Sequence, residues 1–320
     1  MKTSPKSPAL LEAQTGKYLL SPHVPDRMSY IGMGKAVEFA MGLDVNNPYH
    51  VARLHEINPY AKSEDFSGLP KRYKSFLRAQ SAEERRETMQ TAEYISRYDQ
   101  FRTTITSRLG KMVGKGDSSH AYLIEFDGSP YVVRKVHTSA RLAEIDNHLR
   151  AAVRVQDIPH LEHIVAASYR QGETVAPHIA GRDVWQLNQD EVEAITQRQF
   201  DEFYASLEQA YERNVGFDGY GDNIIYDTET GFTGVDLALC DIAHRDPLNA
   251  LYDKFTDQAE LATIDMAGDS YSRSKINVTM KLCRMLADTV EAKNEPDHLP
   301  LVKRLRERAD DLAARLRARE

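Results

Sequence analysis

Cysteine is scarce in this chain, and so are the features that mark secreted and membrane proteins. Among 320 residues only Cys240 and Cys283 carry a thiol, so we expect free thiols and no disulfide framework. No apolar run reaches the roughly 18 residues that cross a bilayer, and the first residues lack the apolar segment of a signal peptide. We therefore expect no membrane span and a cytoplasmic protein, with export by a specialised system as an open alternative.

An excess of positive charge is also absent. The chain has 41 Lys and Arg against 48 Asp and Glu, a net charge of −7, whereas general nucleic-acid binders carry a basic face. No nucleic-acid partner is expected. The length and the hydrophobic content of 41% allow one large core or two modest ones, so composition predicts an ordinary soluble globular protein.

The most informative residues that are present lie in Asp218-Gly-Tyr-Gly-Asp-Asn223 and, further on, at Asp236. Between them, two apolar runs flank Asp227-Thr-Glu-Thr-Gly231, which predicts a tight hairpin with Gly231 at positive φ. Such a hairpin brings its strand ends together, so Asn223 and Asp236 can face one metal site. Their oxygen atoms suit Mg²⁺. A surface hairpin with ordinary Asx turns is the structural alternative.

A second group of residues lies upstream. Residues 109–124 predict a strand, a turn of small residues and a returning strand. Glycines in the turn, Gly114 and Gly116, let a backbone approach phosphates closely and point its amides at them. Asp127-Gly128 then turns the chain into a third strand, which ends at Lys135. Taken alone, Lys135 could equally be a solvated charge at a strand end.

The elements that follow are predicted from hydrophobic periodicity. Residues 139–153 predict a helix, 163–169 and 173–179 predict two strands, 180–183 a connection, and 192–215 one long helix. The apolar residues of the two helices, which we expect in the core, are Leu142, Ile145, Leu149, Val153, Phe200, Phe203, Leu207 and Tyr211.

Taken in order, these elements of residues 105–240 resemble the protein-kinase-like superfamily. The resemblance implies an α+β, bilobal protein-kinase-like fold with a small antiparallel-sheet N-lobe at 105–179 and a reduced helical C-lobe at 180–320. It implies an ATP- and Mg²⁺-dependent phosphotransferase, with Mn²⁺ as an alternative metal, that moves the γ-phosphate to a hydroxyl. ATP and a protein substrate are the partners that it implies.

The resemblance also assigns roles to residues. Asp218 orients the attacking hydroxyl and accepts its proton, Asn223 and Asp236 hold the metal, and Lys135 contacts the α and β phosphates. Glu144, with Asp146 nearby, is the candidate partner of Lys135. The residues expected to cover the phosphates, with Ser119 at the position of the family's third glycine, are Gly114, Lys115, Gly116, Ser118 and Ser119.

Departures from the protein-kinase pattern leave the acceptor open. Gly216-Phe217 replaces His-Arg before Asp218, so control by activation-loop phosphorylation is not expected, and Leu237-Ala238 replaces Phe-Gly after Asp236. Asp246-Pro247 and the hairpin resemble the aminoglycoside and choline phosphotransferase branch. The short distance from the connection to Asp218 favours a minimal serine/threonine kinase of the bacterial effector type. A pseudokinase scaffold or a nucleotidyl transferase are further alternatives.

The two ends of the chain carry no catalytic motif. Residues 1–26 predict a mobile arm, and 27–104 an extension that is partly helical from Ser81 through Tyr98, which we expect to dock on the N-lobe. At the other end, apolar residues recur at spacings of three and four, which predicts a helix packed on the C-lobe, with dimerisation as the alternative. These residues are Val302, Leu305, Ala309, Leu312 and Leu316.

Overall fold

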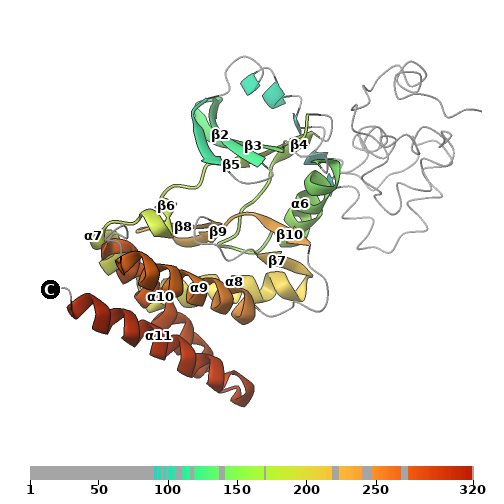
Figure 1. Cartoon of the computed structure of the whole chain (residues 1–320). Helices are drawn as coiled ribbons and strands as arrows, with labels where there is room; N and C mark the ends of the chain where they lie inside the picture. Colours follow the sequence, from blue (N-terminus) through green and yellow to red (C-terminus); the bar gives the residue numbers. More distant parts are fainter. Residues whose placement is uncertain are drawn as a thin grey trace, which may run out of the picture. The chain divides into compact units, whose positions relative to one another are not determined.

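The fold combines small antiparallel sheets with several helices (Figure 1), which agrees with the α+β class expected from the sequence. The computed structural model describes residues 90–318, apart from 92, 95–96, 99, 103, 106–109, 116–118, 137–140, 169–170, 218–222, 240–246 and 268–272. The described residues divide into two compact units. The first ends at Arg154 and also includes His163–His178, while the second comprises Val155–Glu162 and the residues from Ile179 onward.

The first unit is built on a five-stranded antiparallel sheet. Its strands are β1 (Met112–Lys115), β2 (Ser119–Phe126), β3 (Ser129–Val136), β4 (Ala166–Ser168) and β5 (Glu173–Pro177), in the order β1-β2-β3-β5-β4. The predicted turn between β2 and β3 is formed by Asp127 and Gly128, at φ 51° and 72°. Asp-Gly is a preferred pair where both central residues of a hairpin need positive φ.

Two helical segments supply apolar side chains in this unit. Helix α6 (Arg141–Val155) follows β3 and buries Ile145, Leu149 and Val153 at the predicted spacing. The helical residues among 90–105 bury Tyr98, Phe101 and Ile105 in one cluster with residues of β2 to β5. The described part of the extension therefore docks on the sheet, as expected, because its apolar face finds the nearest core. Residues 1–89 lie outside the described part of the chain.

The second unit contains two helices where the sequence predicted one. Helices α7 (Gln189–Ala194) and α8 (Gln197–Glu212) are separated at Thr196, so the prediction of a single helix over 192–215 was wrong. The Thr196 hydroxyl accepts the Gln199 backbone N–H, and the Gln199 side chain accepts the Thr196 N–H, which forms a capping box. Hydrophobic periodicity continues across Thr196, because both helices bury apolar residues, and it therefore hides the break.

Short strands lie beside α8. One sheet has the order β6 (Arg182–Asp183), β8 (Ile224–Asp227) and β9 (Gly231–Gly234), and β7 (Val215–Phe217) pairs with β10 (Leu237–Leu239). The predicted hairpin is thus β8–β9. Phe200 and Phe203 of α8 contact Phe232 of β9, with ring centroids 5.7 and 5.8 Å apart, so aromatic packing fixes the hairpin on the helix.

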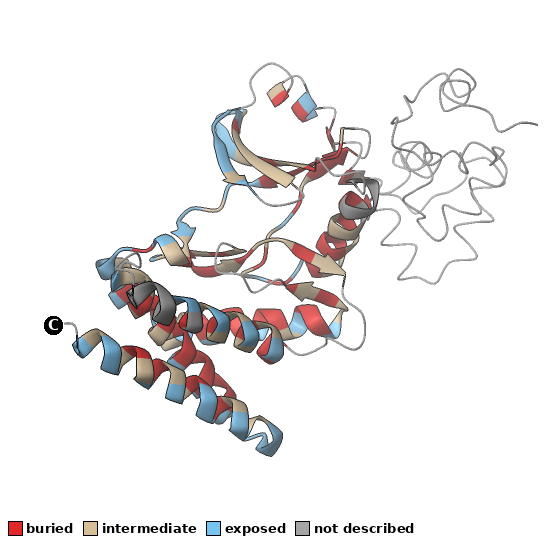
Figure 2. Cartoon of the chain, in the orientation of Figure 1, coloured by how far each residue is buried: buried red, intermediate tan, exposed pale blue. Residues whose placement is uncertain are grey.

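Three helices complete the second unit. Helix α11 (Leu299–Arg317) follows a short 3₁₀ turn, Pro296–His298, and packs on α9 (Pro247–Ala267) and α10 (Arg273–Ala292). Figure 2 shows the burial of each helix, and the predicted stripe of α11 is buried from Val302 to Leu312. The expectation of packing within the chain is therefore confirmed.

Cys283 of α10 is a buried free thiol, and desolvation raises its pKa to about 12. Cys240 lies outside the described residues.

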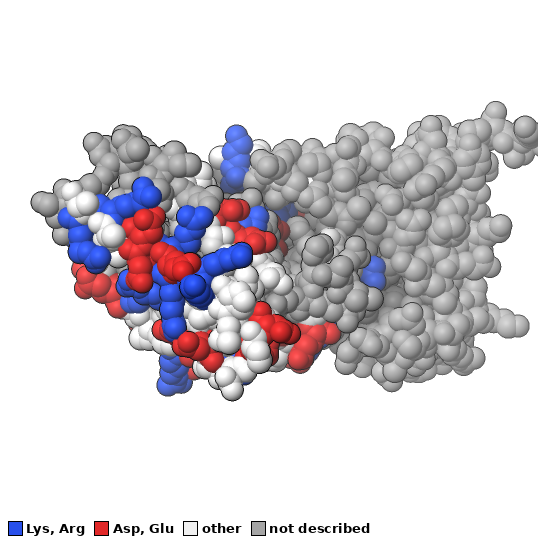
Figure 3. All heavy atoms as spheres, turned by 60° about the horizontal axis from the view of Figure 1, so that its bottom comes forward, with Lys and Arg blue, Asp and Glu red and all other residues white. Residues whose placement is uncertain are grey.

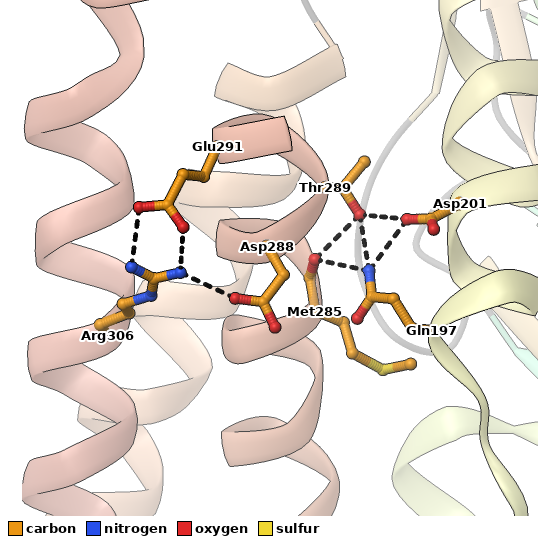
Figure 4. A network of polar contacts seen from close by, with 7 residues as sticks. All are labelled: Gln197, Asp201, Met285, Asp288, Thr289, Glu291 and Arg306. Atoms are coloured by element: carbon orange, nitrogen blue, oxygen red, sulfur yellow. Dashed lines mark hydrogen bonds and ion pairs between the residues drawn. The ribbon is translucent and has the colours of Figure 1, made fainter. Parts of the chain in front are cut away.

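Polar contacts join α10 to its neighbours (Figure 4). Arg306 of α11 donates to Glu291 and Asp288, and Thr289 donates to Asp201 of α8 at 2.6 Å.

Lys and Arg are interspersed with Asp and Glu on the face shown in Figure 3. This mixture is typical of a solvated surface. Among the helices that the structure describes, we find none with the length and apolar character needed to span a membrane.

Candidate active site

The β8–β9 hairpin holds Asn223 and Asp236 at its base. Ile224 pairs with Gly234, and one step further the Val235 N–H donates to the Asn223 carbonyl at 2.9 Å. Asn223 therefore accepts the last backbone hydrogen bond of the hairpin, and Asp236 directly follows the donor Val235. Both residues are partly buried. The hairpin prediction is confirmed. The assignment of these two residues to a metal stays a prediction.

The Asp and Gly of the turn in this hairpin are explained by its structure alone. Asp227 accepts backbone N–H groups from Glu229 and Thr230, both at 3.0 Å, and these bonds lower the pKa of its carboxyl. Gly231 has a φ of 81°, as predicted, and an added Cβ would lie 3.3 Å from the Gln199 side chain. The Asx turn is thus at Asp227, away from the base of the hairpin.

Asp236 has an unusual backbone conformation. Its φ is 65°, in the left-handed region that few non-glycine residues occupy. Its N–H points to Oε2 of Glu162 at 3.5 Å, while the Glu162 N–H donates to the Gly234 carbonyl at 2.8 Å. Residues held in such conformations cluster at functional sites, because the surrounding structure has to impose them. Asp236 shares this conformation with four other described residues, and among the predicted site residues that the structure describes it alone has a positive φ.

Three of the predicted phosphate-covering residues lie on the first two strands of the large sheet. Gly114 and Lys115 are the last residues of β1, and Ser119 is the first of β2, so the two predicted strands are present, while residues 116–118 between them lie outside the described part of the chain. Gly114 pairs with Ala121, after an irregularity in the register between Met112 and Gly114. Gly116 and Ser118 lie outside the described residues, as does Asp218.

Lys135 lies near the end of β3, as predicted, and binds a carboxylate. Its Nζ donates to Oε1 of Glu173 at 2.9 Å, and the two residues face each other across β3 and β5. Glu173 is only 2% exposed, and its Oε2 accepts the hydroxyl of Tyr98. Glu144 lies in α6, but its side chain is outside the described set, so its role as partner stays a prediction.

Glu173 and Tyr98 were not among the residues predicted for the site. Glu173 is 38 positions from Lys135, and no local spacing connects them. One signal was available. Glu173 begins a strand that continues into Val175 and Ala176, and a carboxylate that enters a core needs a cationic or hydrogen-bonding partner. Tyr98 ends the predicted helix that begins at Ser81, and the helical pattern does not show which group its hydroxyl binds.

No protein-family model matches the chain, and neither does any curated protein. Among the side chains that the structure describes, no group of three His, Cys, Asp or Glu is arranged to hold a metal ion. The pair Asn223 and Asp236 is smaller than such a group.

Proposed function

We propose that this protein is an ATP- and Mg²⁺-dependent phosphotransferase with a bilobal protein-kinase-like fold, and that it transfers the γ-phosphate to a serine or threonine hydroxyl of a protein. The observation that carries the proposal is the hairpin that brings Asn223 and Asp236 to one place, with Asp236 at positive φ. The third strand with its lysine, the helix after it and the two further strands follow in the order that the resemblance implies.

The residues at the base of the hairpin suit magnesium. Asn223 offers an amide oxygen and Asp236 a carboxylate, and Mg²⁺ uses few protein oxygens besides water and phosphate. Two protein ligands are therefore enough. When bound, the metal would neutralise the charge of the β and γ phosphates.

Residues of the chain would position the reactants. Lys135 has an ammonium group with three donors and a side chain that is 43% exposed, so it can bind phosphate oxygens while it keeps its bond to Glu173. Gly114 allows close approach of the backbone to phosphate. Asp218 would orient the acceptor hydroxyl and accept its proton. These roles supply orientation and electrostatic stabilisation, which dominate phosphoryl transfer.

Two features favour a protein acceptor over a small molecule. Between β6 and β7 the chain forms only a single 3₁₀ turn, Val184–Gln186, and helices α7 and α8, which leaves no helical insertion to enclose a small acceptor. The Asp246-Pro247 pair is the second feature, because it resembles the small-molecule branch but its proline can be explained by the structure alone. This residue begins α9, and proline is favoured in the first turn of a helix.

The test is transfer of label from ATP with Mg²⁺. The purified chain and its Asp218→Ala variant would be incubated with γ-labelled ATP, with and without a cell lysate, and α-labelled ATP would serve as a parallel sample. We expect the wild type to place γ-label on a protein band and the variant to place none, because the variant lacks the carboxylate that orients the acceptor hydroxyl.

Other patterns of label would contradict the proposal in distinct ways. Label confined to small molecules would assign the protein to the small-molecule kinases. Transfer of α-label would show nucleotidyl transfer. Nucleotide binding with no transfer in any sample would show a pseudokinase.

A further inference from the structure

The partner of Lys135 is part of a three-residue connection within the first unit. Glu173 receives Nζ of Lys135 on Oε1 and the hydroxyl of Tyr98 on Oε2, so each carboxylate oxygen has its own donor. Lys135 and Glu173 come from neighbouring strands, whereas Tyr98 comes from the helical residues among 90–105. A residue of the N-terminal extension is thus one hydrogen bond away from the partner of the lysine.

Burial makes this connection energetically important. Tyr98 is 4% exposed and Glu173 is 2% exposed, so water does not replace a lost partner easily. A buried carboxylate without its hydrogen bonds is costly, and bonds to charged groups are stronger than neutral ones. The position of the Glu173 carboxylate therefore depends on Tyr98 as well as on Lys135.

We propose that Tyr98 and Glu173 are positioning residues for Lys135, through which the N-terminal helix regulates nucleotide binding. Tyr98 fixes one oxygen of Glu173, and Glu173 then directs the lysine ammonium, which keeps two further donors for phosphate oxygens. The part that concerns the nucleotide rests on the proposed function. The connection from Tyr98 to Lys135 does not.

Docking of the helix makes the connection switchable. Tyr98 lies in the same core cluster as Phe101 and Ile105, which pack with Ile124 and Val133 of the sheet. Any event that removes this helix from the sheet also removes the Tyr98 hydroxyl from Glu173. We therefore expect docking of the helix and tight binding of a nucleotide to accompany each other.

The first experiment measures the connection without any nucleotide. The full chain would be treated briefly with an amine-acylating reagent, and mass spectrometry would give the labelling rate of Lys135 relative to the exposed Lys115. Tyr98→Phe should change the relative rate by about threefold or more, because the buried Glu173 carboxylate loses one of its two donors and its hold on Lys135 changes. Tyr94→Phe is the matched control, because Tyr94 is 5% exposed and is a helical residue four positions before Tyr98.

The second experiment measures the consequence for the nucleotide. A fluorescent ATP analogue with Mg²⁺ would be titrated into the wild type, Tyr98→Phe and Tyr94→Phe. Each of the three would be measured both with Lys135 present and with the additional substitution Lys135→Ala. We expect Tyr98→Phe to weaken binding about threefold to tenfold when Lys135 is present and to have no effect when it is absent. A general structural defect would instead weaken binding in both backgrounds.

The outcomes separate the two proposals. If Tyr98→Phe and Tyr94→Phe leave the Lys135 labelling rate equally unchanged, the connection is wrong. If labelling responds to Tyr98→Phe but the wild type does not bind the nucleotide, the connection holds and the proposed function fails. Equal weakening in both Lys135 backgrounds would overturn the regulatory role of Tyr98.

Discussion

At the scale of single residues, two glycines near the candidate site have different reasons to be glycine. Gly231 needs its φ of 81°, which other residues adopt only with strain. An alanine at Gly114 would meet only the Cβ of Ala121 at 3.4 Å, an ordinary contact, and its backbone has no positive φ. The fold therefore requires the first glycine by its φ and not the second, and the phosphate role of Gly114 stays a proposal.

This difference gives a paired prediction. Gly231→Ala should lower the free energy of unfolding by about 1 to 2 kcal/mol, because it forces alanine into the left-handed region. Gly114→Ala should change stability by less than about 1 kcal/mol and yet weaken nucleotide binding. Chemical denaturation and a nucleotide titration would measure both effects. Normal nucleotide affinity in Gly114→Ala would remove the phosphate role of this glycine.

Single residues also show which features of the candidate site can be predicted from the sequence. Gly231, Lys135 and the base of the hairpin were predictable, because turn chemistry and strand patterns are local. The contact between Lys135 and Glu173 was not, because strand order in a sheet decides which distant residues face each other. The positive φ of Asp236 was also beyond prediction, since an aspartate reveals no backbone conformation by itself.

At the scale of elements, periodicity identified most helices and strands but not every boundary. The sequence predicted α6, the β8–β9 hairpin and α11 because each has a clear apolar pattern between turn signals. It merged α7 with α8 because the cap at Thr196 interrupts the backbone and not the hydrophobic pattern. The strand β6, with only two residues, is too short to give a pattern.

The attachment of α11 provides a prediction about stability. Leu305 is completely buried in α11, the helix that packs on α9 and α10, so Leu305→Ala should cost about 2 to 5 kcal/mol through lost burial and a cavity. The adjacent Arg306 is 42% exposed, and exposed ion pairs contribute little, so Arg306→Ala should cost much less despite its bonds to Glu291 and Asp288. Urea denaturation would compare the variants. Equal losses would show that the ion pairs hold α11 in place.

At the scale of the whole molecule, the residues proposed for the nucleotide and for the metal lie in different units. The first holds Lys135 and the strands of the glycine-containing hairpin, and the second holds Asn223 and Asp236. The sequence indicated both sets through the order of its motifs. It gave no equivalent signal for the contact of the extension with Glu173, which the structure shows at the Tyr98 hydroxyl.

The central claim is that Asp236 serves phosphoryl transfer. The most direct measurement compares the wild type with Asp236→Asn in the γ-labelled ATP assay at saturating Mg²⁺, with thermal unfolding measured in parallel. Asparagine tolerates positive φ, so the variant should keep the fold while it loses the carboxylate. We predict that the wild type transfers label and that Asp236→Asn, equally folded, transfers almost none. Transfer by Asp236→Asn at the wild-type rate would contradict the account.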